Sequence, residues 1–372
     1  MADTVLRGIC GLDTFNFPPG LHSGPITRRI FGHGYQSLSY ILDWQEAFLA
    51  SPELDADLCM ISNLFELRKA LRDIAAYSLI IILHGATGDS VSLLRHTAHW
   101  FDRRKGKLMV FVGNEYQLMS EKIELLRQLQ AEYVCSQLPL DAAKWVYSEC
   151  SGSQVLPAPH ALNPQLYKED CAIQRNIDIG FRGARYPFFI GDNERNSIIK
   201  FFTNHGQGHG LLCDIALASL SRKEWSRFLC RCKGVIGVES GTYYLAKDDH
   251  LIREVNQYLA DYSSATFEEI FDRFFLGRSQ QVSGKAISSR HFDPIGTHTC
   301  QLLLEGEYNG ILKPEEHYIC VKKDLSDINE AIRRFKDVDY RQAIVKRSYE
   351  YVMSAHTYSH RVESILGHCL AP

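Results

Sequence analysis

The sequence has little of what marks a membrane-spanning or nucleic-acid-binding protein. Its 41 Lys and Arg nearly balance its 44 Asp and Glu, which leaves a formal net charge of -3 and no broad positive surface for a polyanion. The longest apolar run, Leu79 to Leu83, stops at His84, far short of the ~18 residues that a membrane helix needs. The first residues lack a basic segment followed by an apolar stretch, so we expect no secretion and a cytoplasmic location.

The cysteines do not suggest a disulfide framework. There are eleven, an odd number, scattered from Cys10 to Cys369, which suits free thiols in a reducing compartment. The close pair Cys230 and Cys232 has a one-residue gap, unlike the two-residue gap of common zinc and redox motifs. Internal repeats, low-complexity tracts and coiled-coil heptads are also missing.

What is present is an ordinary globular composition in a chain long enough for two domains. The sequence is 45% hydrophobic and 23% charged over 372 residues, beyond the roughly 250 to 300 residues at which one core stops growing. Strand and helix patterns alternate through the first 160 residues, which predicts βαβ units and a parallel sheet. The expected strands are 5–10, 78–83, 107–112, 132–135 and 154–156, and the expected helices are 63–77, 91–104, 119–130 and 141–149.

A proline-rich segment, Pro157 to Pro164, is the best linker candidate because three prolines in eight residues continue neither a helix nor a central strand. A second α/β half follows. Its expected strands are 177–183, 211–215, 235–238, 301–304 and 317–322, and its expected helices are 194–204, 223–232, 251–275 and 328–370, the last two with breaks near 263 and 355. We therefore predict domains at 1–160 and 161–340, followed by C-terminal helices from 341 to 372.

The stretch from Ser288 to Pro314 carries the densest functional signal. A polar turn with Arg290, Asp293 and Gly296 leads into the buried strand 301–304, which a glycine-rich loop with two glutamates follows. In an open parallel sheet, polar groups next to strand ends are expected at the carboxyl edge, where ligands bind.

Two α/β halves, a proline-rich linker and trailing helices resemble the GT-B glycosyltransferases. The residues Arg290, Phe292, Asp293, Gly296 and the strand after them are similar to the signature of group 1 glycosyltransferases. The segments 237–241, 265–269 and 305–318 look like a bacterial subgroup linked to surface polysaccharides. The resemblance covers most of residues 176–361 and implies two Rossmann-like domains with a nucleotide sugar bound mainly by the second. It also implies that the C-terminal helices 341–372 pack back toward the first domain.

One position departs from the family pattern. Retaining members of group 1 usually carry two glutamates separated by seven residues, but here these positions hold Lys285 and Asp293. The resemblance therefore does not fix donor geometry or stereochemical outcome.

The resemblance and the residue chemistry together suggest a donor site. Asp293 would accept from the ribose hydroxyls, and the backbone of Gly296 and Thr297 would approach the diphosphate. Arg290, with Arg182 beside Gly183, would bind phosphate oxygens. Glu305 is a further donor-binding candidate, since one of the glutamates in its loop is expected to touch ligand. The structural alternatives are a helix cap for Asp293, an ion pair for Arg290 and a solvated turn for Arg182.

Candidate catalytic groups follow apolar strands. Glu239 ends a buried strand inside a glycine-rich turn, where it could instead cap the next segment. His84 and Asp89 follow the strand 78–83 of the first domain, where an acceptor hydroxyl would be deprotonated by an inverting enzyme. Their alternatives are a hydrogen-bonded histidine and a helix cap. Asp13 is a weaker acceptor-side candidate.

No metal or other cofactor is expected. The Asp-x-Asp pairs 55–57 and 337–339 do not end apolar strands, and His205 and His209 lie among glycines instead of on a helix. Fixed cationic donors can stabilise a leaving diphosphate in place of a metal. The basic cluster Arg103 to Lys107 is a solvated helix end or a contact with an anionic membrane surface.

The sequence thus predicts a metal-independent glycosyltransferase that moves a sugar from a nucleotide-sugar donor to a growing cell-surface glycan, such as an O-antigen or capsule. Its expected partners are that donor, a glycan or lipid-linked acceptor and the cytoplasmic face of the inner membrane, but not nucleic acid. A sugar-nucleotide epimerase of the same fold and a non-catalytic scaffold subunit remain alternatives.

Overall fold

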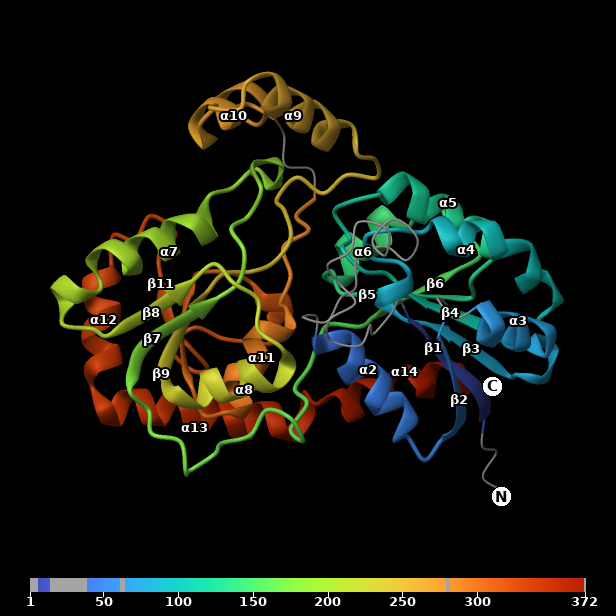
Figure 1. Cartoon of the computed structure of the whole chain (residues 1–372), viewed down its shortest axis with the longest axis horizontal. Coiled ribbons are helices and arrows are strands. Elements are labelled where there is room, and N and C mark those ends of the chain that lie inside the picture. Colours follow the sequence, from blue (N-terminus) through green and yellow to red (C-terminus); the bar gives the residue numbers. More distant parts are fainter. Residues whose placement is uncertain (1–5, 14–38, 61–63, 279–281, 371–372) are drawn as a thin grey trace. The chain divides into compact units, whose positions relative to one another are not determined.

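The computed structural model describes residues 6–13, 39–60, 64–278 and 282–370. The chain divides into two compact units (Figure 1). The first contains residues 1–158, 246–249 and 359–372, and the second contains 159–245 and 250–358. The helix Val338–Ala355 (α13) thus belongs to the second unit, and all but the first residue of Tyr358–Leu370 (α14) belongs to the first.

The first unit is built on a six-stranded parallel sheet in the order β2-β1-β3-β4-β5-β6. Its strands are Leu6–Asp13 (β1), Leu54–Met60 (β2), Leu79–Ile82 (β3), Lys107–Phe111 (β4), Tyr133–Ser136 (β5) and Gln154–Pro157 (β6). Its other helices are Ser39–Leu49 (α2), Leu64–Arg72 (α3), Ser92–Thr97 (α4), Met119–Leu129 (α5) and Leu140–Val146 (α6). The strand β2, which pairs with β1 at the sheet edge, was not predicted from the sequence.

The second unit has a five-stranded parallel sheet in the order β11-β10-β9-β7-β8. Its strands are Ile177–Arg182 (β7), Cys213–Ala216 (β8), Cys232–Gly237 (β9), Cys300–Leu304 (β10) and Ile319–Val321 (β11). Its other helices are Glu194–His205 (α7), Arg222–Arg231 (α8), His250–Asp261 (α9), Phe267–Phe274 (α10), Ser289–Gly296 (α11) and Ile328–Lys336 (α12).

Burial on both faces explains why the central strands read as continuous apolar runs. Every residue of β3 and β10 is buried, as expected where helices cover both sides of a parallel sheet. In the second unit one cluster packs α7 and α12 against the sheet, and another packs α8 and α11 against it. The predicted α/β fold with two parallel sheets is confirmed.

One local prediction in the second unit was wrong. The segment predicted as a polar turn before β10 is the helix α11, with Pro294 inside it. Because a helix between parallel strands runs back against them, only its first turn lies at the carboxyl edge of the sheet. Its C-terminal residues, Gly296 and Thr297, lie instead beside the amino end of β10.

A helical hairpin interrupts the second unit between β9 and α11. The chain leaves the sheet along 240–245, forms α9 and α10, and returns along 282–286 (Figure 1). Backbone hydrogen bonds join the outgoing and returning segments, including Ser240 to Ala286 in both directions and Gly284 to Thr242. We call these two segments the neck of the hairpin, because they fix it over the carboxyl edge of the sheet.

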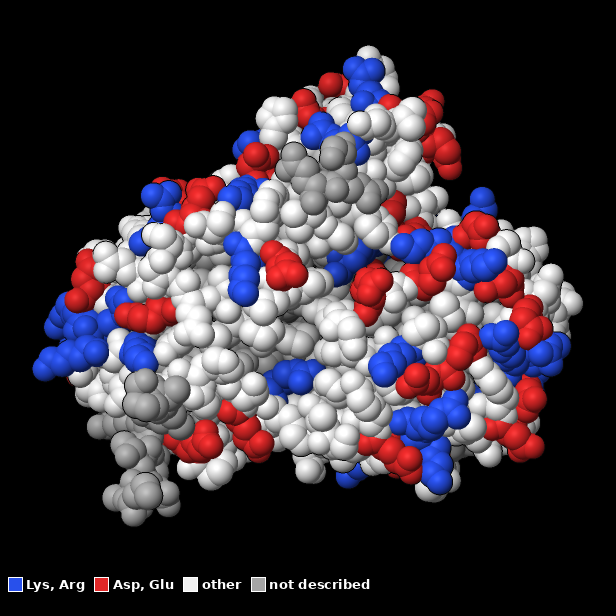
Figure 2. Space-filling model, turned by 180° about the vertical axis from the view of Figure 1, so that it is seen from behind, with Lys and Arg blue, Asp and Glu red and all other residues white. Residues whose placement is uncertain are grey.

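Acidic and basic side chains are interspersed over the face drawn in Figure 2. Among the residues that the structure describes, no helix has both the length and the apolar character needed to cross a bilayer.

Candidate functional site

The order of the second sheet identifies where its ligand site should lie. β7 is the first strand of the unit, and its neighbours β8 and β9 continue the chain on opposite sides. Ligands of such sheets bind outside the carboxyl ends of the strands at this switch point. The loops that leave β7 and β9 there begin with Arg182-Gly183 and with Val238-Glu239.

The first turn of α11 adds a second arginine to this edge. Nη1 of Arg290 donates to the carbonyl oxygen of Arg182 at 2.6 Å, and a Cβ added at Gly183 would lie 3.9 Å from the same nitrogen. The guanidinium also lies 4.9 Å from the ring centroid of Trp225. The positive end of a helix and a bidentate donor group therefore meet beside the backbone of Gly183.

A buried histidine fixes the start of α11. Nδ1 of His291 accepts from the backbone N–H of Ser288 at 2.9 Å, so Nε2 carries the proton and donates to the carbonyl of Val238 at 3.0 Å. Burial lowers the pKa of His291 to about 4. The neutral ring thus ties Arg290 and its helix to the loop after β9.

Arg195, in the first turn of α7, is the third arginine of the edge. Its Nη2 donates to the hydroxyl of Tyr186 at 2.8 Å, and its guanidinium lies 3.6 Å from the centroid of that ring. Burial lowers the pKa of Arg290, the positive charge of Arg195 lowers it further, and the negative charge of Asp293 opposes both effects.

These arginines differ in how their charges are balanced. Arg182 pairs with Asp214 at 2.7 Å. Neither Arg195 nor Arg290, both half-buried, forms an ion pair with a carboxylate within the described part of the chain. Two guanidinium groups without a directly paired carboxylate can bind a multiply charged anion such as a diphosphate, although the charge of Asp293 acts on Arg290 from farther away.

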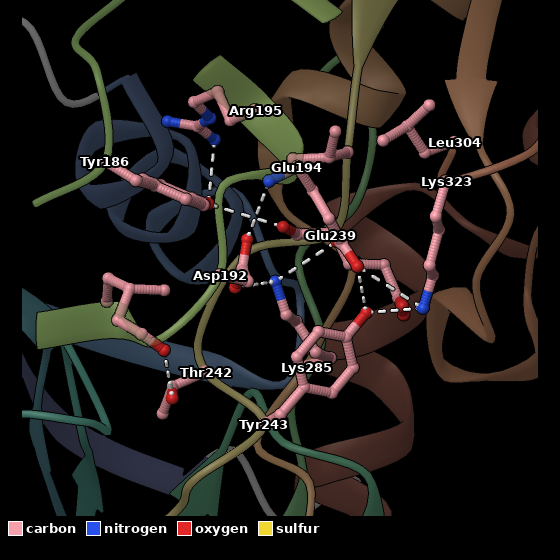
Figure 3. Close-up of polar contacts among 12 residues, drawn as sticks. Tyr186, Asp192, Glu194, Arg195, Glu239, Thr242, Tyr243, Lys285, Leu304 and Lys323 are labelled. Atoms are coloured by element: carbon pink, nitrogen blue, oxygen red, sulfur yellow. Dashed lines mark hydrogen bonds and ion pairs between the residues drawn. The ribbon is translucent and has the colours of Figure 1, made fainter. Parts of the chain in front are cut away.

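A cluster of buried charges continues from this point (Figure 3). Nζ of Lys285, in the hairpin neck, lies 2.7 Å from Asp192 and 3.5 Å from Glu194. Lys285 is 4% exposed, and the attraction of the two carboxylates raises its pKa although burial, the largest single influence, opposes it. Burial raises the pKa of Asp192 despite this pairing.

Tyr243 and Lys323 form the more open end of the cluster. The hydroxyl of Tyr243 donates to Glu194 at 2.6 Å and accepts from Nζ of Lys323 at 2.5 Å. Lys323 also pairs with Glu194 at 3.4 Å, with its side chain 39% exposed. Figure 3 shows Tyr186 between this end and Arg195. We refer to Asp192, Glu194, Tyr243, Lys285 and Lys323 as the charge cluster.

Comparisons with known proteins concern the family of one segment and the fold of the chain. Residues 246–367 match the model of a family described as glycosyl transferase-like. HepE from Anabaena, solved in complex with UDP, is 8% identical, with a TM-score of 0.50 over 97% of this chain and 99% of that chain. A DNA-modifying beta-glucosyltransferase is 10% identical, with a TM-score of 0.50 over 98% of each chain. A search of curated protein sequences found no match.

The chain has the GT-B fold, and its residues 246–367 resemble a glycosyl transferase-like family. The similarity to the solved structures concerns the fold, and the family match covers the end of the hairpin neck, the hairpin and the C-terminal part of the second unit.

The structure brings together some of the predicted donor residues but not others. Arg182, Gly183 and Arg290 meet at the switch point. Asp293 is 2% exposed and accepts from the indole N–H of Trp225 at 2.9 Å. It therefore supports the aromatic ring beneath Arg290, and the prediction that it binds ribose is not supported by this geometry.

The predicted approach of Gly296 and Thr297 to the diphosphate does not fit the structure. A Cβ at Gly296 would collide with the carbonyl of Tyr167 and lie 2.6 Å from Leu162, so glycine is needed there for close packing. Thr297 is fully buried, and its hydroxyl bonds to Pro294 at 3.1 Å. Both residues stabilise the C-terminal end of α11 and do not approach a phosphate.

Glu239 and Glu305 hold loops in place at the carboxyl edge. Glu239 is 5% exposed and accepts from the backbone N–H of Tyr308 at 2.7 Å, and burial raises the pKa of its carboxyl. A Cβ at Gly306 would collide with this carboxylate. Glu305 is exposed and accepts from the backbone N–H of Lys323 at 3.2 Å. Both glutamates thus position the charge cluster without belonging to it.

In the first unit, the loop after β3 holds the two candidate bases in different surroundings. His84 is 1% exposed and lies among the rings of Tyr40, Trp44 and Phe111, with centroids 5.2 to 6.0 Å away. Asp89 is exposed and accepts a hydrogen bond from the side-chain amide of Asn114. Asp89 is therefore the accessible candidate, and His84 is part of an aromatic core.

The loop after β4 lies next to Asp89, because Asn114 in that loop donates a hydrogen bond to the carboxylate of Asp89. Nζ of Lys122 donates to the carbonyls of Gly113, Asn114 and Gln117 at 2.6 to 3.0 Å, and burial lowers its pKa to about 8. Asn114 has a positive φ of 47°. Lys122 thus holds the strained loop that presents Asn114 to Asp89. Asp13 ends β1 at the same edge of the sheet, and its side chain lies outside the described residues.

Arg195, Tyr186 and most of the charge cluster were not predicted from the sequence. Arg195 lies in the helix after β7, and its role emerges only when the first turns of α7 and α11 are both placed at the carboxyl edge of the sheet. The one available signal was Lys285, which stands where the family carries a glutamate. Within the described residues, no group of three or more His, Cys, Asp or Glu side chains is arranged to hold a metal ion.

Proposed function

We propose that this chain is a glycosyltransferase and that it binds the diphosphate of a nucleotide-sugar donor between Arg195, Arg290 and the first turn of α11. The observation that carries the proposal is the pair of half-buried guanidinium groups without carboxylate partners in the described chain. A diphosphate supplies the missing negative charge and offers oxygens to both planar donors.

The reaction follows from these groups. The bond between the anomeric carbon and the diphosphate oxygen breaks, and an acceptor hydroxyl forms the new glycosidic bond with that carbon. The two arginines stabilise the charge that develops on the leaving diphosphate. The acceptor proton passes to a base, for which Asp89 is the exposed candidate at a strand end of the first unit.

We further propose that the acceptor is a growing cell-surface glycan and that no metal takes part. The acceptor class rests on the likeness of 237–241, 265–269 and 305–318 to a surface-polysaccharide subgroup. The proposed place of action is the cytoplasmic face of the membrane, where lipid-linked acceptors are made. Transfer to a lipid-linked oligosaccharide in the presence of EDTA tests both statements. Activity that needs an added divalent cation would contradict the second.

The donor proposal is tested by thermal shift with UDP, GDP, dTDP, ADP and CMP and their sugar derivatives. A nucleotide that binds only the folded state raises the melting temperature. We expect at least one nucleoside diphosphate to do so in the wild type, and Arg290→Gln to weaken its binding about tenfold or more.

Arg333→Gln is the matched control, because Arg333 is an exposed arginine of α12 that pairs with Glu330. It should bind like the wild type. Absence of a shift with every nucleotide would contradict the proposal and would favour a scaffold role, while conversion of the free donor to another sugar nucleotide would favour the epimerase alternative.

A further inference from the structure

The charge cluster and the adjacent Glu239 together contain three carboxylates but only two lysines. The two lysines, Lys285 and Lys323, are both paired with carboxylates, and the cluster holds two carboxylates of its own. Glu239 is the third of these carboxylates, and the positive charges of both lysines lower the pKa of its carboxyl against the effect of burial. A ligand that enters beside Lys323 therefore meets two lysines of the cluster, and each of them is already paired with a carboxylate.

The phosphate region of the same edge has the opposite balance. Arg195 and Arg290 are half-buried and lack carboxylate partners within the described chain. Their two charges match those of a diphosphate, which carries about two negative charges near neutral pH. The positive charges of Arg195 and Arg290 thus remain available for the diphosphate. Those of Lys285 and Lys323 in the charge cluster are already paired with carboxylates.

Tyr186 connects the two regions. Its hydroxyl accepts from Arg195 at 2.8 Å and donates to the backbone carbonyl of Glu239 at 3.3 Å, while Nζ of Lys285 lies 5.9 Å from its ring centroid. A diphosphate held by the arginines would therefore place the attached sugar next to the cluster, whose open end carries the hydroxyl of Tyr243 and the ammonium of Lys323 (Figure 3).

We propose that the charge cluster is the sugar subsite and that it selects a donor whose sugar carries no negative charge, a neutral hexose instead of a uronate. This inference rests on the proposed donor function. Glu194, Tyr243 and Lys323 can exchange hydrogen bonds with sugar hydroxyls. A uronate carboxylate would face Asp192, Glu194 and Glu239 in a poorly solvated setting with no free cation among the described residues, and like charges in contact are strongly unfavourable.

The position of Lys285 supports this assignment. Group 1 relatives carry a glutamate there, whereas this chain carries a lysine whose partners, Asp192 and Glu194, come from the loop after β7 and the start of α7. The carboxylates of the proposed sugar subsite thus come from the segment after β7 instead of from position 285, and Lys285 is buried between Asp192 and Glu194.

The first test measures dissociation constants calorimetrically for three pairs: UDP-glucose and UDP-glucuronate, GDP-mannose and GDP-mannuronate, and dTDP-glucose and dTDP-glucuronate. We expect the neutral member of at least one pair to bind, and its uronate to bind about tenfold or more weakly. If a neutral donor and its uronate bind equally, the sugar inference is overturned and the donor proposal stands. If no member of any pair binds, both fail.

The second test changes the charge of the subsite in both directions. Glu194→Gln keeps the size of the side chain but removes one negative charge, so the preference for the neutral sugar should fall about tenfold. Lys323→Met removes one positive charge from a partly exposed position, so the same preference should rise. A substitution that only damages the site would weaken the binding of both donors. It would not make the ratio of the two dissociation constants change in opposite directions in Glu194→Gln and Lys323→Met.

Matched controls remove the same charges elsewhere. Glu330→Gln on α12 and Lys346→Met on α13 alter exposed residues and should leave the ratio unchanged. Binding of the corresponding free nucleoside diphosphate, with retained melting temperature, verifies that each variant is folded. A ratio that does not respond to Glu194→Gln in a folded, nucleotide-binding protein would overturn the inference.

Discussion

At the scale of single residues, the site depends on charges whose partners are unevenly distributed. Arg182 is paired with Asp214, whereas the contacts of Arg195 and Arg290 described above are a hydroxyl, a carbonyl and aromatic rings. Removing a half-buried cation from water has a cost that these neutral contacts offset only in part. The arginines are therefore placed to gain from an anionic ligand.

Asp89 provides a prediction for the acceptor side. Asp89→Asn preserves the size of the side chain and removes its ability to accept a proton, so kcat for transfer should fall by about 10² to 10⁴. Donor binding, measured by calorimetry, should stay within about twofold of the wild type, because the donor residues belong to the other unit and additivity holds for independent sites. An unchanged kcat would exclude Asp89 as the base.

His291 provides a prediction about acid sensitivity. Its folded pKa of about 4 lies below the unfolded value of roughly 6.5, so its contribution to stability is complete above the unfolded pKa and is lost as the pH falls toward the folded one. Between about pH 7 and pH 5 the wild type should lose about 2 kcal/mol through this group.

Urea unfolding at these two pH values measures this loss. His291→Gln cannot titrate, so its stability should change between them by about 2 kcal/mol less than that of the wild type. Equal changes in both proteins would show that the ring does not restrict protonation, and the account of its two hydrogen bonds would be wrong.

At the scale of elements, α11 explains why two predicted residues are not in the site. Gly296→Ala should destabilise the protein by about 1 to 3 kcal/mol, because its Cβ would collide with the backbone carbonyl of Tyr167. Gly367, in α14, has open space where a Cβ would lie, so Gly367→Ala should stabilise by up to about 1 kcal/mol. Chemical denaturation compares the two variants.

Nucleotide binding distinguishes packing from recognition in the same pair. Folded Gly296→Ala protein should bind the donor nucleotide as the wild type does, since Gly296 is at the C-terminal end of α11 and Arg290 is in its first turn. Selective loss of nucleotide affinity in a fully folded variant would restore Gly296 to the phosphate site.

Strand and helix patterns in the sequence were sufficient to predict most of the fold. Apolar runs such as 79–83 and 301–304 are long enough to identify buried parallel strands without any tertiary information. The strand β2 was missed because an edge strand is half exposed, and its residues 55–57 read as a polar pair around an alanine. The turn assigned to 288–297 was wrong because Pro294 and Gly296 suggested a break, although tertiary packing maintains a helix there.

The candidate site was less predictable than the fold. Arg182, Gly183 and Arg290 could be chosen because glycine and arginine next to strand ends are local signals. Arg195 and Glu194 could not, since they are ordinary first-turn residues of a helix until β7, β9 and the hairpin neck bring Tyr186 and Lys285 to them. Side chains whose roles depend on contacts between distant segments leave no periodic trace in a single sequence.

At the scale of the whole molecule, the chain consists of two units with separate sheets. The proposed donor groups belong to one unit and the candidate base to the other, so a bound donor should slow hydrogen exchange in only one of the two units. Hydrogen exchange with and without saturating donor nucleotide tests this expectation peptide by peptide. Protection reflects the loss of local opening where the ligand adds contacts.

We expect donor-dependent protection in three segments of the second unit: the loop and first turn after β7, the hairpin neck, and the first turn of α11. These correspond to residues 182–195, 239–245 with 282–286, and 287–292. The central strands β3 and β4 of the first unit should exchange at the same rate in both states, because their residues are buried in a core that the donor groups do not share. Protection centred on 84–89 instead would place the nucleotide in the first unit and would reverse the assignment of donor and acceptor sides.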